Sequence, residues 1–305
     1  MHLFFAPLQG YTDYLYRNAH RLLVGGVDAY FSPFVRWDGS LRNKDVRDVS
    51  ASNNEGTPVV PQLIAADVDE LNPLLDLVEQ QGYRRVDFNM GCPFPLQTGR
   101  GRGSALLARP DSVRLLMEAF RQRPELQLSV KMRAGFDNAS QGLEVVSLLN
   151  DYPLEFITIH PRLTSQQYKG SVDGEAFGRM LAASHHRVVF NGDVGSVADI
   201  DGIAQRWPQL HGVMVGRGLL ARPTLASEWR QGTSLPEAEV LRVSLALHNR
   251  LFDDACRLLQ GDQQVLARMR AFWEYQQPLI DKKSYKRLMR TSSLRNYEET
   301  VRNMQ

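Results

Sequence analysis

Six side chains that can donate a proton, accept a hydrogen bond or carry charge stand at or just beyond short β-rich runs of the sequence: Gln62, Asn89, Cys92, Lys131, His160 and Asn191. Each taken alone has a structural interpretation, as a paired Lys or His, a capping amide, or a Cys that packs as a small hydrophobe. Their origin in five different runs favours a functional interpretation, because the carboxyl ends of parallel strands meet on one rim of a barrel. We therefore predict one site in which a thiol lies beside basic and amide side chains.

Alternation of apolar and polar residues indicates which side chains face the barrel interior. In the run Arg85–Met90 the apolar residues share one face and would pack under helices, whereas Asp87 and Asn89 share the other and point inward. The segment Gly91-Cys92-Pro93 follows directly. The next two runs would turn inward the polar residues Ser129, Lys131, Arg133 and His160.

Two glycine-containing segments predict a phosphate site. Asn191–Ser196 follows the seventh run and Gly216-Arg217-Gly218 follows the eighth. Loops after strands seven and eight of a (β/α)8 barrel commonly bind phosphate through backbone N–H groups, and a guanidinium such as that of Arg217 adds ionic hydrogen bonds. The chain has no P-loop, no Rossmann glycine fingerprint and no convincing His/Cys/carboxylate cluster. We expect a phosphate-bearing organic cofactor and no metal.

A basic, glycine-rich segment follows Cys92 closely. It contains Arg100 and Arg102 between the glycines at 99, 101 and 103. We interpret it as a mobile basic loop over the pocket. The alternative is an exposed flexible loop whose charge is incidental.

Eight β-rich runs separated by amphipathic stretches predict an α/β fold, a (β/α)8 TIM barrel, over residues 1–235. We expect the strands at His2–Leu8, Ala29–Phe34, Val59–Ile64, Arg85–Met90, Leu128–Arg133, Phe156–His160, Val188–Asp193 and Gly212–Gly216. The predicted helices include Val68–Gln81, Asp111–Arg121, Gly142–Asn150, Gly174–Ala183 and Ser196–Arg206. The polar stretch Arg36–Thr57 lacks periodicity and is predicted to be a long loop.

The pattern changes after the turn-like segment Gly232–Pro236. Strand signals stop, and Glu237–Gln260, Gln263–Gln277 and Tyr285–Met304 predict helices. We therefore expect a small all-α helical domain over residues 236–305. Its last 41 residues carry 9 Lys/Arg against 4 Asp/Glu, in a chain whose net charge is only +2, so this end is suited to a polyanion.

Composition is that of an ordinary globular enzyme. Hydrophobic residues make up 43% and charged residues 23% of the 305 residues. No apolar run is long enough to span a membrane, and the N-terminus does not read as a signal peptide. The two cysteines, Cys92 and Cys256, are far apart in sequence, which favours a reducing cytoplasmic location over a disulfide scaffold. We interpret Cys256, among helical residues, as a core filler.

The motifs taken together resemble the tRNA dihydrouridine synthases along almost the whole chain. The matching segments are Ala6-Pro7-Leu8 with Thr12-Asp13, Pro61-Gln62-Leu63, Asp87–Pro93, Gly101–Leu107, Val130–Arg133, His160-Pro161-Arg162, Asn191-Gly192-Asp193 and Val215–Gly218. A single one of these segments is unspecific, but their order and spacing are highly specific.

The resemblance implies an FMN at the barrel mouth, with NADPH as reductant, and reduction of the C5–C6 double bond of a tRNA uridine. The implied FMN-binding residues are Ala6, Pro7 and Leu8 along the flavin, Gln62, Lys131 and His160 at its ring and ribityl chain, and Asn191, Gly192, Asp193, Gly216 and Arg217 at its phosphate. The implied substrate-binding residues are Asn89, Arg100, Arg102, Arg133 and Arg162.

The same resemblance implies that Cys92 is the general acid, since hydride addition at C6 of uracil requires a proton at C5. A thiol of ordinary pKa, about 8.5, is mostly protonated at neutral pH and can supply it. The target base would have to swing out of the folded tRNA, which the basic C-terminal helices would hold by its backbone. We expect a monomer, since this leaves the barrel mouth clear for tRNA.

Three positions depart from the family pattern. Ser32-Pro33 replaces a Ser-Glu or Thr-Glu pair, Pro95 stands where Lys is common, and Pro161 where Gly is frequent. Two other functions therefore stay open. One is an FMN-barrel reductase of a small molecule, and the other is a flavin-containing RNA-binding protein with little turnover.

Overall fold

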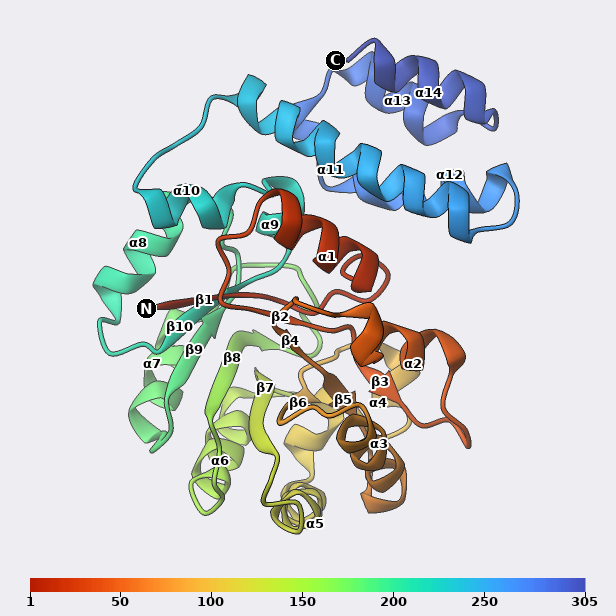
Figure 1. The fold of residues 1–305 in the computed structure, drawn as a ribbon. Coiled ribbons are helices and arrows are strands. Elements are labelled where there is room, and N and C mark those ends of the chain that lie inside the picture. The colour runs from red at the N-terminus through yellow and green to blue at the C-terminus, as the bar shows by residue number, and fades with distance from the viewer. Residues whose placement is uncertain (305) are drawn as a thin grey trace.

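The computed structural model describes residues 1–304, and in this part of the chain ten parallel strands form one curled sheet surrounded by helices (Figure 1). The strands are β1 (His2–Phe5), β2 (Ala29–Phe31), β3 (Val35–Arg36), β4 (Val59–Val60), β5 (Gln62–Ile64), β6 (Arg85–Met90), β7 (Gln127–Gly135), β8 (Phe156–Leu163), β9 (Val188–Asn191) and β10 (Gly212–Val215).

The two ends of the curled sheet meet at Pro61, which lies between β4 and β5. The strand order is β3-β5-β6-β7-β8-β9-β10-β1-β2-β4, and only Pro61 separates β4 from β5. One predicted strand, Val59–Ile64, is thus interrupted, and another, Ala29–Phe34, ends early at Phe31. Pro61 has no N–H for the ladder, and the segment around Pro33 separates β2 from β3. The predicted (β/α)8 barrel is confirmed, with these two differences as corrections to its strand boundaries.

Helices cover the outside of the barrel, as Figure 1 shows. They are α1 (Tyr14–Leu23), α2 (Asn43–Val49), α3 (Val68–Gln80), α4 (Pro95–Thr98), α5 (Pro110–Arg121), α6 (Ala139–Leu149), α7 (Gly174–Ala183), α8 (Val197–Arg206), α9 (Arg217–Ala221) and α10 (Leu225–Gln231). Side-chain caps fix where several of them start. Asp67 accepts from the N–H of Glu70, and capping boxes begin α6 at Asn138 and α8 at Ser196.

The stretch predicted as a long loop is partly ordered into helix. Residues 36–57 contain α2 and a 3₁₀ turn, Ala51–Asn53. Tertiary contacts hold α2 in place: Asp48 is buried, forms an ion pair with Arg17 at 3.1 Å, and accepts the N–H of Tyr14 at 2.6 Å. A seven-residue helix fixed in this way has no periodicity for a sequence pattern to detect.

The C-terminal region is helical, with α11 (Glu237–Leu258), α12 (Asp262–Glu274), α13 (Lys282–Arg290) and α14 (Leu294–Arg302). One helix was expected over 285–304, but α13 ends at Arg290 and Ser293 caps α14 by accepting the N–H of Asn296. Cys256 is exposed, so its interpretation as a core residue was wrong.

The helical region packs on the N-terminal part of the barrel. Helix α11 lies along α1, and the two lie side by side in Figure 1. Arg268 of α12 forms an ion pair with Asp13 at 2.6 Å, and the hydroxyl of Tyr11 donates to Glu274 at 2.8 Å. These contacts place the C-terminal end of α12 near the loop that follows β1.

Candidate functional site

Two adjoining pockets open at the carboxyl ends of the strands. One has a volume of about 390 Å³ and is lined by the ends of β1, β9 and β10. The other, about 290 Å³, surrounds Cys92. Five residues line both pockets: Pro7, Leu8, Lys131, His160 and Tyr168. The two pockets together form one site large enough for a cofactor with a substrate beside it.

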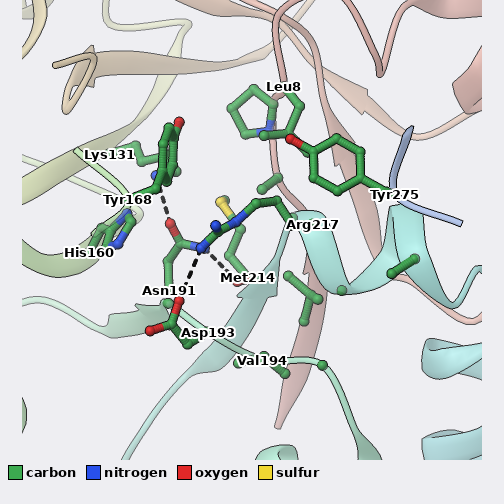
Figure 2. A pocket seen from close by; sticks show the side chains of 18 residues that line it. Leu8, Lys131, His160, Tyr168, Asn191, Asp193, Val194, Met214, Arg217 and Tyr275 are labelled. Atoms are coloured by element: carbon green, nitrogen blue, oxygen red, sulfur yellow. Dashed lines mark hydrogen bonds and ion pairs between the residues drawn. The ribbon is translucent and has the colours of Figure 1, made fainter. Parts of the chain in front are cut away.

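The larger pocket contains most of the residues that the sequence assigned to a cofactor: Ala6, Pro7, Leu8, Lys131, His160, Asn191, Gly192, Asp193, Gly216 and Arg217. Figure 2 shows Lys131, Tyr168 and His160 on one side of it, Tyr275 on the other, and Arg217 between them. Gln62, the remaining member of that predicted set, lines the Cys92 pocket instead.

Backbone geometry and close packing explain why a glycine stands at position 192 of this pocket. Gly192 has φ +152°, and a Cβ there would lie 2.6 Å from Val172 Cγ1. A larger residue at 192 would therefore be strained and would displace the loop 164–173. Asp193, next in the chain, adopts the left-handed conformation with φ 47°.

The side chain of Asp193 forms ion pairs with arginines of the site and has no hydrogen-bond donor for a phosphate. Its carboxylate forms ion pairs with Arg162 and, at 3.0 Å, with Arg217. The N–H groups of Gly195 and Ser196 are likewise occupied, because both donate to Asp199 at 2.9 and 2.8 Å. The donors left for a phosphate are the Arg217 side chain and the N–H groups at the start of α9, which have no carbonyl one turn earlier in the helix.

Cys92 lies at the edge of the smaller pocket, 8% exposed. Asn89 Oδ1 accepts the backbone N–H groups of Gly91 at 3.0 Å and Cys92 at 2.8 Å. Gly103 packs closely behind, since a Cβ on it would lie 2.9 Å from that of Cys92. Burial raises the pKa of the Cys92 thiol above its ordinary value, so the thiol keeps its proton at neutral pH.

A chain of buried hydrogen bonds runs beneath Cys92. Asn89 Nδ2 donates to Gln62 Oε1 at 2.7 Å, and Gln62 Nε2 donates to Asp87 at 2.6 Å. Ser129 also donates to Asp87, at 2.7 Å. Burial raises the pKa of the Asp87 carboxyl to about 7, although the hydrogen bonds from Gln62 and Ser129 oppose this.

Lys131 and His160 differ in charge at neutral pH. Burial and the nearby Arg133 lower the pKa of Lys131 to about 8, so this residue stays largely cationic at pH 7, and its Nζ donates to Asn191 Oδ1 at 2.8 Å. Burial and the cations Lys131 and Arg133 lower the pKa of His160 well below its ordinary value. His160 is therefore neutral. Since Arg162 can only donate, its 3.0 Å contact makes His160 Nε2 the acceptor and Nδ1 the protonated nitrogen.

The arginines assigned to the substrate lie in different places. Arg133 lines the Cys92 pocket, donates to the carbonyls of Gly91 and Leu163, and has its guanidinium 5.6 Å from the Tyr168 ring centre. Arg162 is 2% exposed and lies behind His160 with Asp193. Arg162 lines neither pocket, and its assignment to the substrate stays a prediction.

Arg100 and Arg102 differ in burial, although both pair with Asp38. Arg100 is 54% exposed on its side chain and pairs with Asp38 at 2.8 Å. Arg102 is buried, where it pairs with Glu70 at 2.6 Å and Asp38 at 2.8 Å and donates to the carbonyl of Trp37. The expectation of a mobile loop carrying Arg102 over the pocket was therefore wrong, because two carboxylates fasten this segment to α3 and to the segment after β3.

Sequence reasoning did not place Tyr168 or Tyr275 in these pockets, nor Phe34 and Phe94, which line the smaller one. Tyr168 lies in both pockets, with Arg133 and Arg217 near its ring at 5.6 and 4.9 Å. Tyr275 reaches the larger pocket from just beyond α12 and contacts Tyr11 edge-on, with ring centres 5.1 Å apart. Neither tyrosine follows a strand directly, so the rule that located the other residues did not apply to them.

No cluster of three or more His, Cys, Asp or Glu side chains arranged to hold a metal ion occurs within residues 1–304. In the same range, every helix is too short or too polar to cross a membrane.

Solved structures of other proteins have the same barrel fold. The barrel is similar to morphinone reductase, with a TM-score of 0.52 and 13% identity over 77% of this chain and 86% of that one. It is also similar to the old yellow enzyme from Trypanosoma cruzi, with a TM-score of 0.54 and 10% identity over 77% and 89%. At such identities the likeness shows the fold, a (β/α)8 barrel.

Sequence relatives define the family. The dihydrouridine synthase (Dus) family model matches residues 4–305, and the chain belongs to this family. The tRNA-dihydrouridine(16) synthase of Neisseria meningitidis serogroup B is 28% identical over 235 residues, covering 74% of this chain and 70% of that protein. That of Cupriavidus necator is 29% identical over 239 residues, covering 73% and 72%. A probable tRNA-dihydrouridine synthase of Rhodobacter capsulatus is 31% identical over 227 residues, covering 72% and 67%. The predicted family is confirmed.

Proposed function

We propose that this protein reduces a uridine of tRNA, the one at position 16, to 5,6-dihydrouridine, with FMN in the larger pocket and NADPH as reductant. Family membership supports the reaction, and the names of the Neisseria and Cupriavidus relatives support the position. The observation that carries the proposal is that the buried Cys92 thiol and Lys131 line the same pocket, and that this pocket shares five lining residues with the larger one.

The residues that line the larger pocket support FMN as its ligand. Two of its glycine positions, Gly192 and Gly218, have no room for a side chain, and Arg217 with the first N–H groups of α9 forms a small cationic end for a phosphate. Ala6, Pro7 and Leu8 would line the ring system. These residues would hold FMN, which would supply the hydride for C6 of the uracil, with NADPH as the source of the electrons.

Residues of the chain would do the remaining work. Lys131 places a positive charge beside both pockets and can stabilise negative charge that develops in the reacting rings. Cys92 would donate its proton to C5 of the uracil, and its raised pKa keeps that proton available at physiological pH. Arg133 retains N–H groups that can bind a uracil carbonyl oxygen. Asn89 keeps one N–H for the uracil, because its Nδ2 donates once, to Gln62, while its Oδ1 holds the Cys92 loop.

We further propose that residues 1–235 act as the catalytic unit and residues 236–305 as the part that binds tRNA, with the protein acting as a monomer. A groove on α13 and α14 contains Lys283, Lys286, Arg287 and Arg290. Four cations in one groove favour a phosphate backbone as the ligand, and this binding would weaken steeply with salt.

The test is a reaction of the purified flavoprotein with NADPH and an unmodified tRNA transcript that has uridine at position 16. Mass mapping of nuclease fragments should find a gain of two hydrogens at that position. The gain should be absent when the transcript carries cytidine there. A flavin that NADPH reduces while every uridine stays intact would contradict the proposal and would favour a small-molecule substrate.

A further inference from the structure

The entrance of the Cys92 pocket is apolar, although its interior is polar. Gln62, Asn89, Lys131 and Arg133 line the interior. We call the apolar residues at the entrance the apolar rim, and it consists of Pro33, Phe34, Phe94 and Leu96. Phe94 is 48% exposed and Leu96 is 66% exposed, and both follow Cys92 within four residues.

The apolar rim is held in position by the structure behind it. The N–H of Gln97 donates to the carbonyl of Phe94 at 2.8 Å, which starts the short helix α4. Arg102, a few residues on, is fastened to Glu70 and Asp38. The rim therefore presents a fixed surface, and ordering it would cost little when a ligand binds.

We propose that the apolar rim stacks the base of a nucleotide adjacent to the target uridine, so that the site binds two consecutive unstacked nucleotides. This inference rests on the proposed function, because the neighbouring base is brought to the rim only if the uracil enters the Cys92 pocket. The rim is continuous with that pocket, and Arg36, which pairs with Asp38 at 2.9 Å, lines the same cavity along the path of a linking phosphate.

An RNA base explains the exposed rim better than the phosphate backbone does. Phosphates are bound by cations, and they gain nothing from Phe94 or Leu96. A base that has lost its stacking partner exposes both faces to water, and a fixed aromatic side chain can cover one of them. Phe94 also lies next to Tyr168, with ring centres 6.4 Å apart, so an aromatic surface extends from the rim to the shared wall of the two pockets.

The test is a coupling experiment between Phe94 and the neighbouring base. Hairpin RNAs carry the target uridine with either a normal or an abasic nucleotide on its 5′ side or its 3′ side. They are bound to the wild-type flavoprotein, Phe94→Ala and Phe94→Trp. Leu115→Ala serves as a control, since Leu115 is 64% exposed on α5 and lines neither pocket. Bound flavin, followed by its absorbance, reports that each variant is folded.

We expect Phe94→Ala to weaken binding of the normal hairpin about tenfold, and an abasic neighbour on one side to weaken wild-type binding by a similar factor. The Phe94→Ala variant with the abasic hairpin should bind only slightly more weakly than either change makes it bind alone. Phe94→Trp should retain tight binding, and Leu115→Ala should match the wild type.

Independent, multiplicative losses on both sides would overturn the proposal, as would a Phe94→Ala variant that binds as the wild type does. A wild-type dimer that Phe94→Ala makes monomeric would also overturn it, because a second copy would then occupy the rim. Failure of the proposed function looks different. In that case the wild type would leave position 16 unreduced, whatever the hairpins show.

Discussion

The backbone N–H of Cys92 donates to Asn89 Oδ1 at 2.8 Å, so a side chain at the end of β6 sets the position of the thiol that follows it. A backbone N–H can only donate, which fixes the oxygen of the Asn89 amide toward the loop and its nitrogen toward Gln62. The same reasoning carries on to Asp87, which accepts from Gln62. The orientation of both amides is thus determined by their partners.

Replacing Asn89 should therefore impair catalysis through the position of Cys92. Asn89→Ala leaves two backbone N–H groups and Gln62 Oε1 without partners, and should lower the free energy of unfolding by about 2–3 kcal/mol. Asn89→Asp keeps the acceptor oxygen, so its free energy of unfolding and its rate of uridine reduction should fall less than those of Asn89→Ala. Urea unfolding and single-turnover uridine reduction measure both effects. Equal behaviour of the two variants would argue against this role.

Cys92→Ala should separate binding from chemistry. The variant should retain its flavin and its affinity for tRNA, while the rate of dihydrouridine formation falls by about 10²–10⁴, the usual range for loss of a general acid. Mass analysis of the tRNA and the flavin absorbance spectrum provide the two measurements. Wild-type turnover in this variant would exclude Cys92 as the proton donor.

Arg217→Ala should weaken FMN binding about tenfold, because it removes a charged donor from the phosphate end of the larger pocket. Titration of the apoprotein with FMN, followed by flavin fluorescence, gives the dissociation constant. Arg84→Ala is the control, since Arg84 pairs with Glu125 on the surface, where its side chain is 71% exposed. If both variants bind FMN alike, the phosphate lies elsewhere.

Asp87 should make stability depend on pH between about 4 and 7. Its carboxyl has a pKa near 7 in the folded chain against an ordinary value of 3.8, so the folded state holds the proton more tightly. The stabilising contribution is then complete below about pH 4 and is lost as the pH rises through 7. Relative to Asp87→Asn, the wild type should lose on the order of 1–4 kcal/mol between pH 4 and pH 8, measured by urea unfolding. Parallel pH profiles for the two proteins would show that Asp87 does not titrate in this range.

Arg102 and Arg100 share Asp38 as a partner but differ in burial, which makes them a matched pair. Arg102→Ala leaves the Glu70 carboxylate without its ion-pair partner, while Asp38 keeps Arg36 and Arg100, and should destabilise the protein by about 2–4 kcal/mol. Arg100→Ala should change stability by less than about 1 kcal/mol. Thermal unfolding compares them directly. A larger effect at Arg100 would reverse this assignment.

The limits of sequence analysis can be seen at individual residues. The bounds of β6 were predicted to the residue, because strict alternation ends there at a Gly-Cys-Pro turn. The break at Pro61 could have been foreseen from its missing N–H, and the end of α13 from the capping residue Ser293. The burial of Arg102 could not, since its partners are 32 and 64 residues away in sequence and a Gly-Arg-Gly-Arg segment looks exposed. Tyr275 was equally hidden, because its contact with the pocket depends on how α12 packs against the barrel.

Because of Tyr275, the barrel and the helical region are not independent parts of the chain. The wall of the larger pocket is completed by a residue from the far side of the linker at Gly232–Pro236, which lies beside Leu8 and across the pocket from Tyr168 (Figure 2). Chimeras that exchange the helical region between relatives, in order to redirect the enzyme to another tRNA position, would exchange part of the cofactor pocket as well. Designers of such chimeras would need to keep the residue at 275 together with the barrel it faces.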